Sequence, residues 1–465
     1  MQKSVLVPWL VLALAGGTIA TSAPAAPPPG AQPTLEVLAA RIKALEESSQ
    51  QLREQAAAAL AAAKAAQAEL ASLKSAQQQS AVAAVSEPAA AAPQGGSGIG
   101  TGNAFNPAIS VILNGFYTDH SNQPNASLRR GFPIIGEGGP LPQGFSLGES
   151  EVSLAANIDD KFYGQMTVTA ESEDGEDHFG VEEAYVDTTA LPDGFGARAG
   201  RFYSNIGYLN SHHAHTDFFS VRPFAYQAFL GNQYGDDGVQ LQWVAPTDLF
   251  LQFGTEAFRG DNYPAAGASN GGLGAHTFYV HAGGDVGIQN AWFAGLSMLR
   301  TNTHLGDDGY SGRDTVYIAD GTWKWSPHGN FKDGGFMLRG EYLADQREGR
   351  YAAPAEPLPL MANADPLDTL FAQPWIGTRR GMYAEGVYRF DRTWEAGYRY
   401  DKLWGADDAG PYASAFDPVR NSLMLTWHNS EFSLVRLQVS HDRPSDNSLI
   451  LQYQTALGAH GAHKF

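Results

Sequence analysis

The sequence predicts an all-β fold: a transmembrane antiparallel β-barrel of about 16 strands, preceded by an N-terminal α-helical coiled coil. Three observations predict it: an N-terminal secretion signal, alternating segments from residue 105 onward, and no later apolar run of the ~20 residues that a membrane helix needs. The last segment alternates clearly, with its apolar face formed by Leu449, Leu451, Tyr453, Thr455, Leu457 and Ala459. A closed barrel crosses a bilayer with every backbone group paired, so the pattern indicates a bacterial outer membrane.

Residues 1–25 are predicted to be a secretory signal peptide. Lys3 precedes an apolar run that starts at Val5, and small residues with a candidate cleavage triplet at Ala23-Pro24-Ala25 follow it. The run has about half of the ~20 residues that a membrane-spanning helix requires. We therefore exclude this segment from the fold.

Composition and charge narrow the class of protein. The chain has 52 glycines, 11% aromatic and 17% charged residues, which is typical of strands that alternate between two environments. It has no cysteine, which excludes a lipid-modified cysteine and a disulfide framework. The formal net charge of -19 argues against a nucleic-acid partner. Residues 1–103 hold six basic and six acidic side chains, so the net negative charge belongs to the predicted barrel.

Residues 34–80 are predicted to form a periplasmic coiled coil, followed by a flexible linker rich in Ala, Pro, Gly and Ser at residues 81–104. Thr34 suits the start of the helix as its N-cap. A solitary solvated helix is the alternative, but it would leave the apolar seam in water. The a and d positions of the heptads are Leu35, Leu38, Ile42, Leu45, Ser49, Leu52, Ala56, Ala59, Ala63, Ala66, Leu70, Leu73 and Gln77.

The barrel is predicted to occupy residues 105–465. Its candidate strands lie near 108–117, 147–158, 162–171, 179–188, 196–203, 238–245, 248–258, 275–286, 290–300, 314–325, 334–345, 379–390, 393–402, 421–429, 432–442 and 447–465. Connections after even-numbered strands are short, as at Asp159-Asp160, whereas several after odd-numbered strands are long, as at 204–237 and 346–378. Short turns on one rim and long loops on the other fit periplasmic and extracellular faces.

Strand alternation also predicts which side chains face the lumen. Acidic groups there outnumber basic ones by about two to one. The alternative is that most of them are wall residues that pair across strands. The pore candidates are Glu149, Glu151, Glu171, Glu183, Glu256, Asp320, Arg339, Glu341, Arg389, Arg399 and Arg436.

The long loop after the fifth predicted strand contains a histidine cluster. Its candidate metal ligands are His212, His213, His215 and Asp217, because imidazoles at this spacing suit Zn, Ni or Cu. We expect the loop to fold inward and narrow the pore. The alternative is a loop packed on the wall, where the histidines supply hydrogen bonds and aromatic contacts beside Phe218 and Phe219.

A known group shares this organisation. The signal peptide, coil, linker, Asn103-Ala-Phe-Asn-Pro opening and strand pattern resemble the phosphate-selective porin O/P superfamily, and more closely its branch of zinc-regulated outer-membrane receptors. The resemblance implies a homotrimeric barrel with a periplasmic coil. The terminal Phe465 resembles the signal that the barrel-assembly machinery reads.

The expected function is passive diffusion of small polar solutes or ions, with a preference for cations because the predicted lumen is acid-rich. Expected partners are outer-membrane lipid, two further copies of the chain, the barrel-assembly machinery and, through the coil, peptidoglycan. The alternatives are an uptake channel for zinc or another divalent metal, and a structural tether to the cell wall. We expect no enzymatic activity and no cofactor other than bound or transported Zn, because the sequence lacks an oriented Ser-His pair for hydrolysis.

Overall fold

The computed structural model divides the chain into two units, Met1–Ser97 and Gly98–Phe465. Outside the described residues lie Phe465 and, apart from Lys43, the predicted signal peptide, coil and linker. In the part of the chain that the structure describes, no helix is long and apolar enough to span a membrane. The described residues are 43, 107–122, 132, 139–173, 176–265, 272–303, 310–351, 373–405, 417–443 and 446–458.

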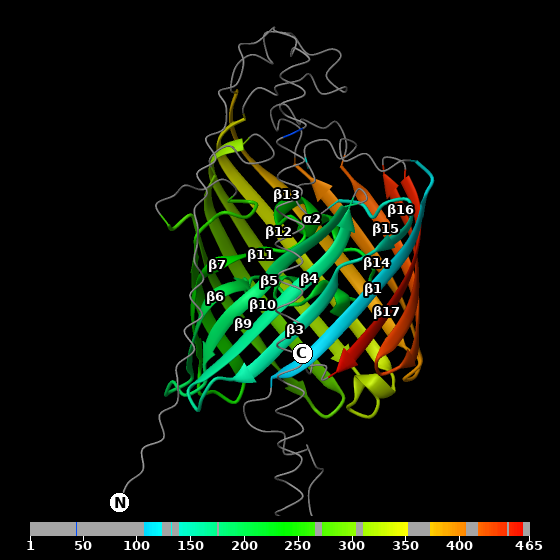
Figure 1. Cartoon of the computed structure of the whole chain (residues 1–465), viewed down its shortest axis with the longest axis horizontal. Helices are drawn as coiled ribbons and strands as arrows, with labels where there is room; N and C mark the ends of the chain where they lie inside the picture. The colour runs from blue at the N-terminus through cyan, green and yellow to red at the C-terminus, as the bar shows by residue number, and fades with distance from the viewer. Residues whose placement is uncertain are drawn as a thin grey trace, which may run out of the picture. The chain divides into compact units, whose positions relative to one another are not determined.

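The second unit is an antiparallel sheet that closes on itself, which confirms the predicted barrel (Figure 1). From β3 onward each strand pairs with the next one in sequence, β1 pairs with β2 and β3, and the last strand pairs back with β1. The strands are β1 (Ala108–His120), β2 (Gly144–Leu147), β3 (Ser150–Asn157), β4 (Phe162–Glu173), β5 (Glu176–Thr188), β6 (Phe195–Tyr203), β7 (Gly235–Val244), β8 (Phe250–Phe258), β9 (Ala275–Val286), β10 (Asn290–Thr303), β11 (Tyr310–Trp325), β12 (Gly335–Tyr351), β13 (Gln373–Arg389), β14 (Trp394–Trp404), β15 (Val419–Ser430), β16 (Ser433–Arg443) and β17 (Asp446–Gly458).

The wall has sixteen strand positions, because β2 and β3 both pair with β1 and together fill one of them. The break between them lies at Gly148, whose backbone N–H donates to the carbonyl of Asn114 at 2.9 Å. A Cβ at residue 148 would lie 2.2 Å from the ring of Phe116, so glycine permits this close approach. The strand predicted near 147–158 is therefore interrupted at Gly148, beside the ring of Phe116.

The rims differ as the sequence predicts. The connections at 158–161 and 390–393 are short, whereas 121–143 and 204–234 are long and lie at the opposite ends of the strands. The faces also follow the predicted alternation. Tyr398, Leu423 and Val439 are cross-strand neighbours that point outward and are about half exposed, while Gln438 and Ser422 point inward and are buried.

Residues 204–234, here called the inward loop, occupy part of the barrel interior. The loop carries two 3-10 helices, η3 (Leu209–Ser211) and η4 (Ala214–Thr216), and the short helix α2 (Phe224–Phe229). Every residue of α2 is buried, and the helix lies against β12, β13 and β14 (Figure 1). Its apolar side chains form a core with inward-facing wall residues such as Leu343 and Leu403. Another short 3-10 helix, η5 (Phe331–Asp333), lies in the turn before β12.

The outward face of the barrel exposes many large apolar side chains, as expected of a transmembrane barrel that contacts lipid. Leu423, near the middle of β15, is 62% exposed on this face. We expect Leu423→Arg to lower the free energy of unfolding in lipid vesicles by about 2–4 kcal/mol, because a guanidinium near the membrane midplane is poorly solvated. Denaturant titration of vesicle-inserted protein measures the change. Leu423→Ala is the matched control and should cost much less; equal costs for both would contradict a lipid-facing position.

Candidate functional site

Wall carboxylates hold the inward loop in place. Glu341 of β12 is buried and accepts four hydrogen bonds, two at each oxygen. The backbone N–H groups of Tyr208 and Leu209 donate at 3.1 Å each. The hydroxyls of Tyr226 and Tyr383 donate at 2.8 and 2.7 Å. One carboxylate therefore satisfies two loop amides, a helix tyrosine and a wall tyrosine.

Two further wall acids do the same at other points of the loop. Glu256 of β8 accepts from the Asn205 backbone N–H at 2.9 Å and from the Ser204 hydroxyl. Asp401 of β14 accepts from the backbone N–H of Phe224, the first residue of α2, at 3.0 Å. Because buried backbone donors are costly when unpaired, these acids stabilise the loop inside the barrel.

The arginines predicted to line the lumen are bonded to wall residues. Arg339 pairs with Glu385, and Arg389 pairs with Glu395. Arg399 donates to Asp401 at 3.0 Å, while Arg436 donates to Thr426 and Gln452. Most of the predicted lumenal charges are thus engaged in the wall or the loop. Arg339, Arg389 and Arg436 bond to residues of a neighbouring strand, which is the pairing across strands given as the alternative, whereas Arg399 and Asp401 lie on the same strand.

Three other pore candidates have different surroundings. Asp320 of β11 is buried, and neither of its carboxylate oxygens has a hydrogen-bond partner among the described residues. Glu171 of β4 is partly exposed and lies opposite His178 of β5 in the strand register. Glu149 follows the break between β2 and β3, and one of its carboxylate oxygens lies within 4.8 Å of ligand atoms of Glu151 and Glu182.

A cavity of about 1100 Å³ lies between the inward loop and the inner face of β1 and β3–β10. Amide and aromatic side chains such as Gln165, Gln242, Tyr163 and Trp292 make up much of its lining. The charged side chains in the lining, with the histidines, are Glu151, Glu183, Asp187, Asp285, Arg198, His212, His213, His215 and His281. Acidic groups outnumber the guanidinium here, so the local acidic excess predicted for the lumen persists where the interior is hollow.

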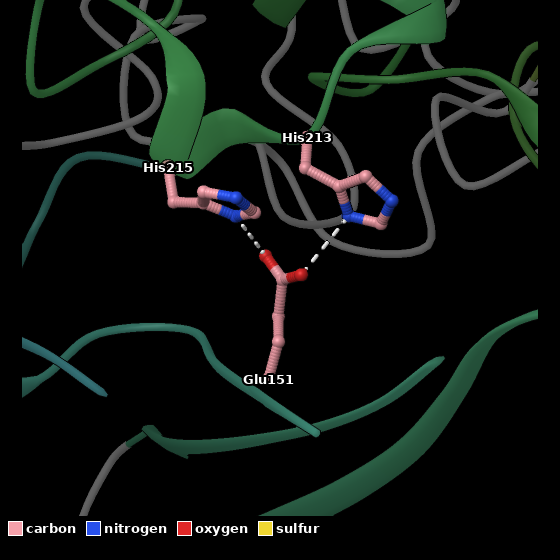
Figure 2. A group of neighbouring side chains, drawn as sticks. All are labelled: Glu151, His213 and His215. Atoms are coloured by element: carbon pink, nitrogen blue, oxygen red, sulfur yellow. Dashed lines mark hydrogen bonds and ion pairs between the residues drawn. The ribbon is translucent and has the colours of Figure 1, made fainter. Parts of the chain in front are cut away.

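Two histidines of the loop meet one carboxylate of the wall at this cavity. Figure 2 shows Glu151 pointing from β3 between the imidazoles of His213 and His215. Nδ1 of His215 lies 2.7 Å from Oε1 of Glu151, and Nδ1 of His213 lies 3.1 Å from Oε2. The backbone explains this convergence: His213 is the N-cap of η4, and His215 lies in its single turn.

A β-bulge brings two more carboxylates to the same place. In the pairing of β4 with β5, Thr167 lies opposite Glu183 but Val168 lies opposite Val181, so Glu182 is the extra residue. Val181 faces outward, whereas the side chains of Glu182 and Glu183 are both 7% exposed inside the barrel. Oε2 of Glu182 lies 3.3 Å from Nδ1 of His213, and Oε2 of Glu183 lies 3.0 Å from its Nε2. A bulge redirects side chains, and here it places consecutive residues on one face.

The carboxylates control the charge of His213. Burial lowers the pKa of this imidazole, but its contacts with Glu151, Glu182 and Glu183 outweigh burial and raise the pKa well above its ordinary value. In the absence of a competing cation, these contacts favour the imidazolium form of His213, which bridges the loop and two wall strands. Such hydrogen bonding to the wall is the alternative, predicted from the sequence, to metal binding by the loop histidines.

His212 and Asp217 do not join this cluster. The His212 ring stacks on Tyr208 at 4.6 Å between centroids, and its Nδ1 lies 2.6 Å from the Tyr208 carbonyl oxygen. Asp217 pairs with Arg222 at 2.8 Å. Burial raises the pKa of Asp217, opposed by the Arg222 charge. Of the four predicted metal ligands, the structure brings together only His213 and His215.

Glu182 is the site residue that strand alternation misses. Strict alternation assigns Glu183 to the lumen and therefore its neighbour Glu182 to lipid. The signal in the sequence is Val181-Glu182-Glu183, because an acid on the lipid face of a strand would be costly. An acidic residue at a position that the two-residue period assigns to lipid therefore indicates a bulge.

Comparisons with known proteins support the fold. No family model matches the chain. It is similar to an uncharacterized protein of Aquifex aeolicus, at 29% identity over an alignment of 407 residues that covers 78% of this chain and 80% of that protein. OmpF of Salmonella typhi, in a complex with daunomycin, has a TM-score of 0.50 at 12% identity and covers 76% of this chain and 99% of that chain. OprB of Pseudomonas putida has a TM-score of 0.49 at 10% identity, covering 76% and 94%. The likeness to OmpF shows a shared barrel fold.

The anchoring role of Glu341 can be tested by one isosteric change. Glu341→Gln replaces one acceptor oxygen by a donor, so two of the four donors lose their partner. We expect a loss of about 1–3 kcal/mol in the free energy of unfolding, because buried donors of the loop and the wall are left unpaired. Glu348→Gln, on the same strand with a mostly exposed side chain, is the matched control. A stability of Glu341→Gln equal to that of the unaltered protein would refute the anchoring role.

Proposed function

We propose that the protein is a porin of the bacterial outer membrane that allows passive diffusion of small polar solutes or ions. The observation that carries this proposal is a closed barrel with an apolar outward face and a polar cavity beside an inward loop. A loop that narrows the lumen limits solute size, while amide and hydroxyl groups in the lining replace part of a solute's hydration. Transport accounts for these features without any catalytic group.

The charges around the cavity support a preference for cations. Glu151, Glu183, Asp187 and Asp285 face it, and Arg198 is the guanidinium in the same lining. The cross-strand ion pair of Arg198 with Asp187, at 2.7 Å, cancels one charge of each sign. Glu151, Glu183 and Asp285 remain, and the His213 imidazole in contact with the first two offsets only part of their charge. A low-dielectric wall focuses the remaining negative potential on the hollow interior, which raises the local concentration of cations.

The assembly proposed for this channel is a homotrimer surrounded by outer-membrane lipid and inserted by the barrel-assembly machinery. The resemblance of the sequence to the phosphate-selective porin O/P superfamily and its zinc-regulated branch supports the trimer and a periplasmic coil at residues 34–80. Self-association of the coil would raise the local concentration of the barrels, so even a modest coil favours the oligomer.

Recordings in planar bilayers test the channel and its selectivity together. We expect discrete conductance steps and reversal potentials on the cation-selective side at low salt, with weaker selectivity at high salt because ions screen the wall charges. Asp285→Asn removes an exposed acid of the cavity and should reduce the cation preference. Asp248→Asn, in the turn after β7 and outside the lining, is the matched control. Anion selectivity of the unaltered protein would overturn the cation preference, and absence of conductance would overturn the channel.

The coil offers a different function, a tether between the barrel and peptidoglycan. Deletion of residues 34–80 separates the two functions, because a channel formed by the barrel alone retains its conductance. We expect the deleted protein to conduct as the full chain does. A weakened cell envelope with unchanged conductance would show that tethering is a second function; loss of conductance would show that the pore itself needs the coil.

A further inference from the structure

We propose that Glu151, His213 and His215, with Glu182 as a fourth ligand, form a binding site for a divalent transition-metal cation at the wall of the cavity. The site lies in the diffusion path of the proposed porin, and this placement rests on that proposed function. Binding of the ion itself does not require a conducting channel. The two proposals can therefore fail separately.

The positions of the ligand atoms suit a small cation. One ligand atom from each of Glu151, His213 and His215 lies within 4.8 Å of the others. Neighbouring ligands of a tetrahedral ion at about 2.0–2.1 Å lie roughly 3.3 Å apart. Glu151 already lies at 2.7 and 3.1 Å from the two imidazole nitrogens, so side-chain rotations of modest size would complete the geometry.

The donor set selects the class of metal. Two imidazoles and carboxylates suit Zn²⁺, Ni²⁺ and Cu²⁺, as the borderline members of the divalent series. Ca²⁺ and Mg²⁺ prefer six or more oxygen ligands, which this group does not offer. With neutral imidazoles, Glu151 and Glu182 would balance the two positive charges of the ion.

Glu182 is an independent sign of a binding site. Its side chain is 7% exposed, and its Oε1 atom accepts a hydrogen bond from the Tyr203 hydroxyl. Its Oε2 atom is buried without a hydrogen-bond donor among the described residues and has the His213 imidazole at 3.3 Å. A bulge in β5 is what turns this carboxylate into the barrel. Burying an acid beside Glu151 and Glu183 is costly unless positive charge compensates it, and a divalent cation would do so more completely than one imidazolium.

The site is also accessible and tied to the loop. His213, His215 and Glu151 all line the cavity, and the imidazole of His213 is 18% exposed. An ion there would connect η4 of the inward loop with β3 and β5 of the wall. No other cluster that pairs histidines with acids at ligand spacing occurs among the residues that the structure describes.

Calorimetric titration of the detergent-purified full chain with ZnCl₂ tests the site directly. We expect saturable binding of one ion per chain, and a Kd at least tenfold higher for His215→Gln, Glu151→Gln and Glu182→Gln. His212→Gln is the matched control, because that ring stacks on Tyr208 and lies outside the ligand group, so its Kd should not change. CaCl₂ should bind at least tenfold more weakly than ZnCl₂.

A folding readout separates lost binding from lost structure. Each variant should keep heat-modifiable migration on gels and unfold at a denaturant concentration near that of the full chain. No zinc binding by the unaltered protein, or equal affinity in His215→Gln and Glu151→Gln when both are folded, would overturn the metal site. Zinc binding by a protein without conductance would support the site and overturn the porin, whereas conductance without zinc binding would do the reverse.

Discussion

The structure depends on one constraint: a loop folded inside a barrel must find partners for its buried backbone groups. Where the loop packs against the wall its backbone groups are buried, and the neighbouring strands already use their own backbone groups in the sheet. Side chains of the wall must therefore supply the acceptors. Glu341, Glu256 and Asp401 do so from three different strands. The acid-rich lumen is thus first of all a set of anchors for the inward loop.

This constraint changes the meaning of lumenal charge. A count of inward-facing acids overstates the field in the interior, because carboxylates such as Glu341, Glu385 and Asp401 are buried in hydrogen bonds with the loop or in pairs with arginines. In the proposed channel, a diffusing ion meets the smaller group of charges that borders the hollow side of the barrel. The selectivity of such a channel depends on the position of each charge relative to the loop, which alternation along a strand does not specify.

The sequence predicts the barrel well, because in a regular antiparallel sheet the two-residue period assigns side chains to the two faces. The lengths of the connections likewise distinguish the two rims. All sixteen strand positions and the outward row through Leu423 could be read in this way. The site was less predictable. Glu182 faces inward because a bulge breaks the period. His212 lies apart from the cluster because it ends η3 and its ring stacks on Tyr208. His213 and His215 belong instead to η4, as its N-cap and within its turn. The two-residue period of the strands specifies neither the bulge nor these turns of the loop.

The two sides of the inward loop differ in a way that separates structural from functional contacts. Toward β12 and β14 its partners Glu341 and Asp401 are almost fully buried, so solutes do not reach them. Toward β3 and β5 its contacts pass through imidazoles that border the cavity. The first set of contacts does not involve the imidazoles, so a change of partner at His213 or His215 breaks none of its hydrogen bonds. In the proposed channel, the ionisable groups at the cavity can therefore meet a solute while the buried contacts hold the loop.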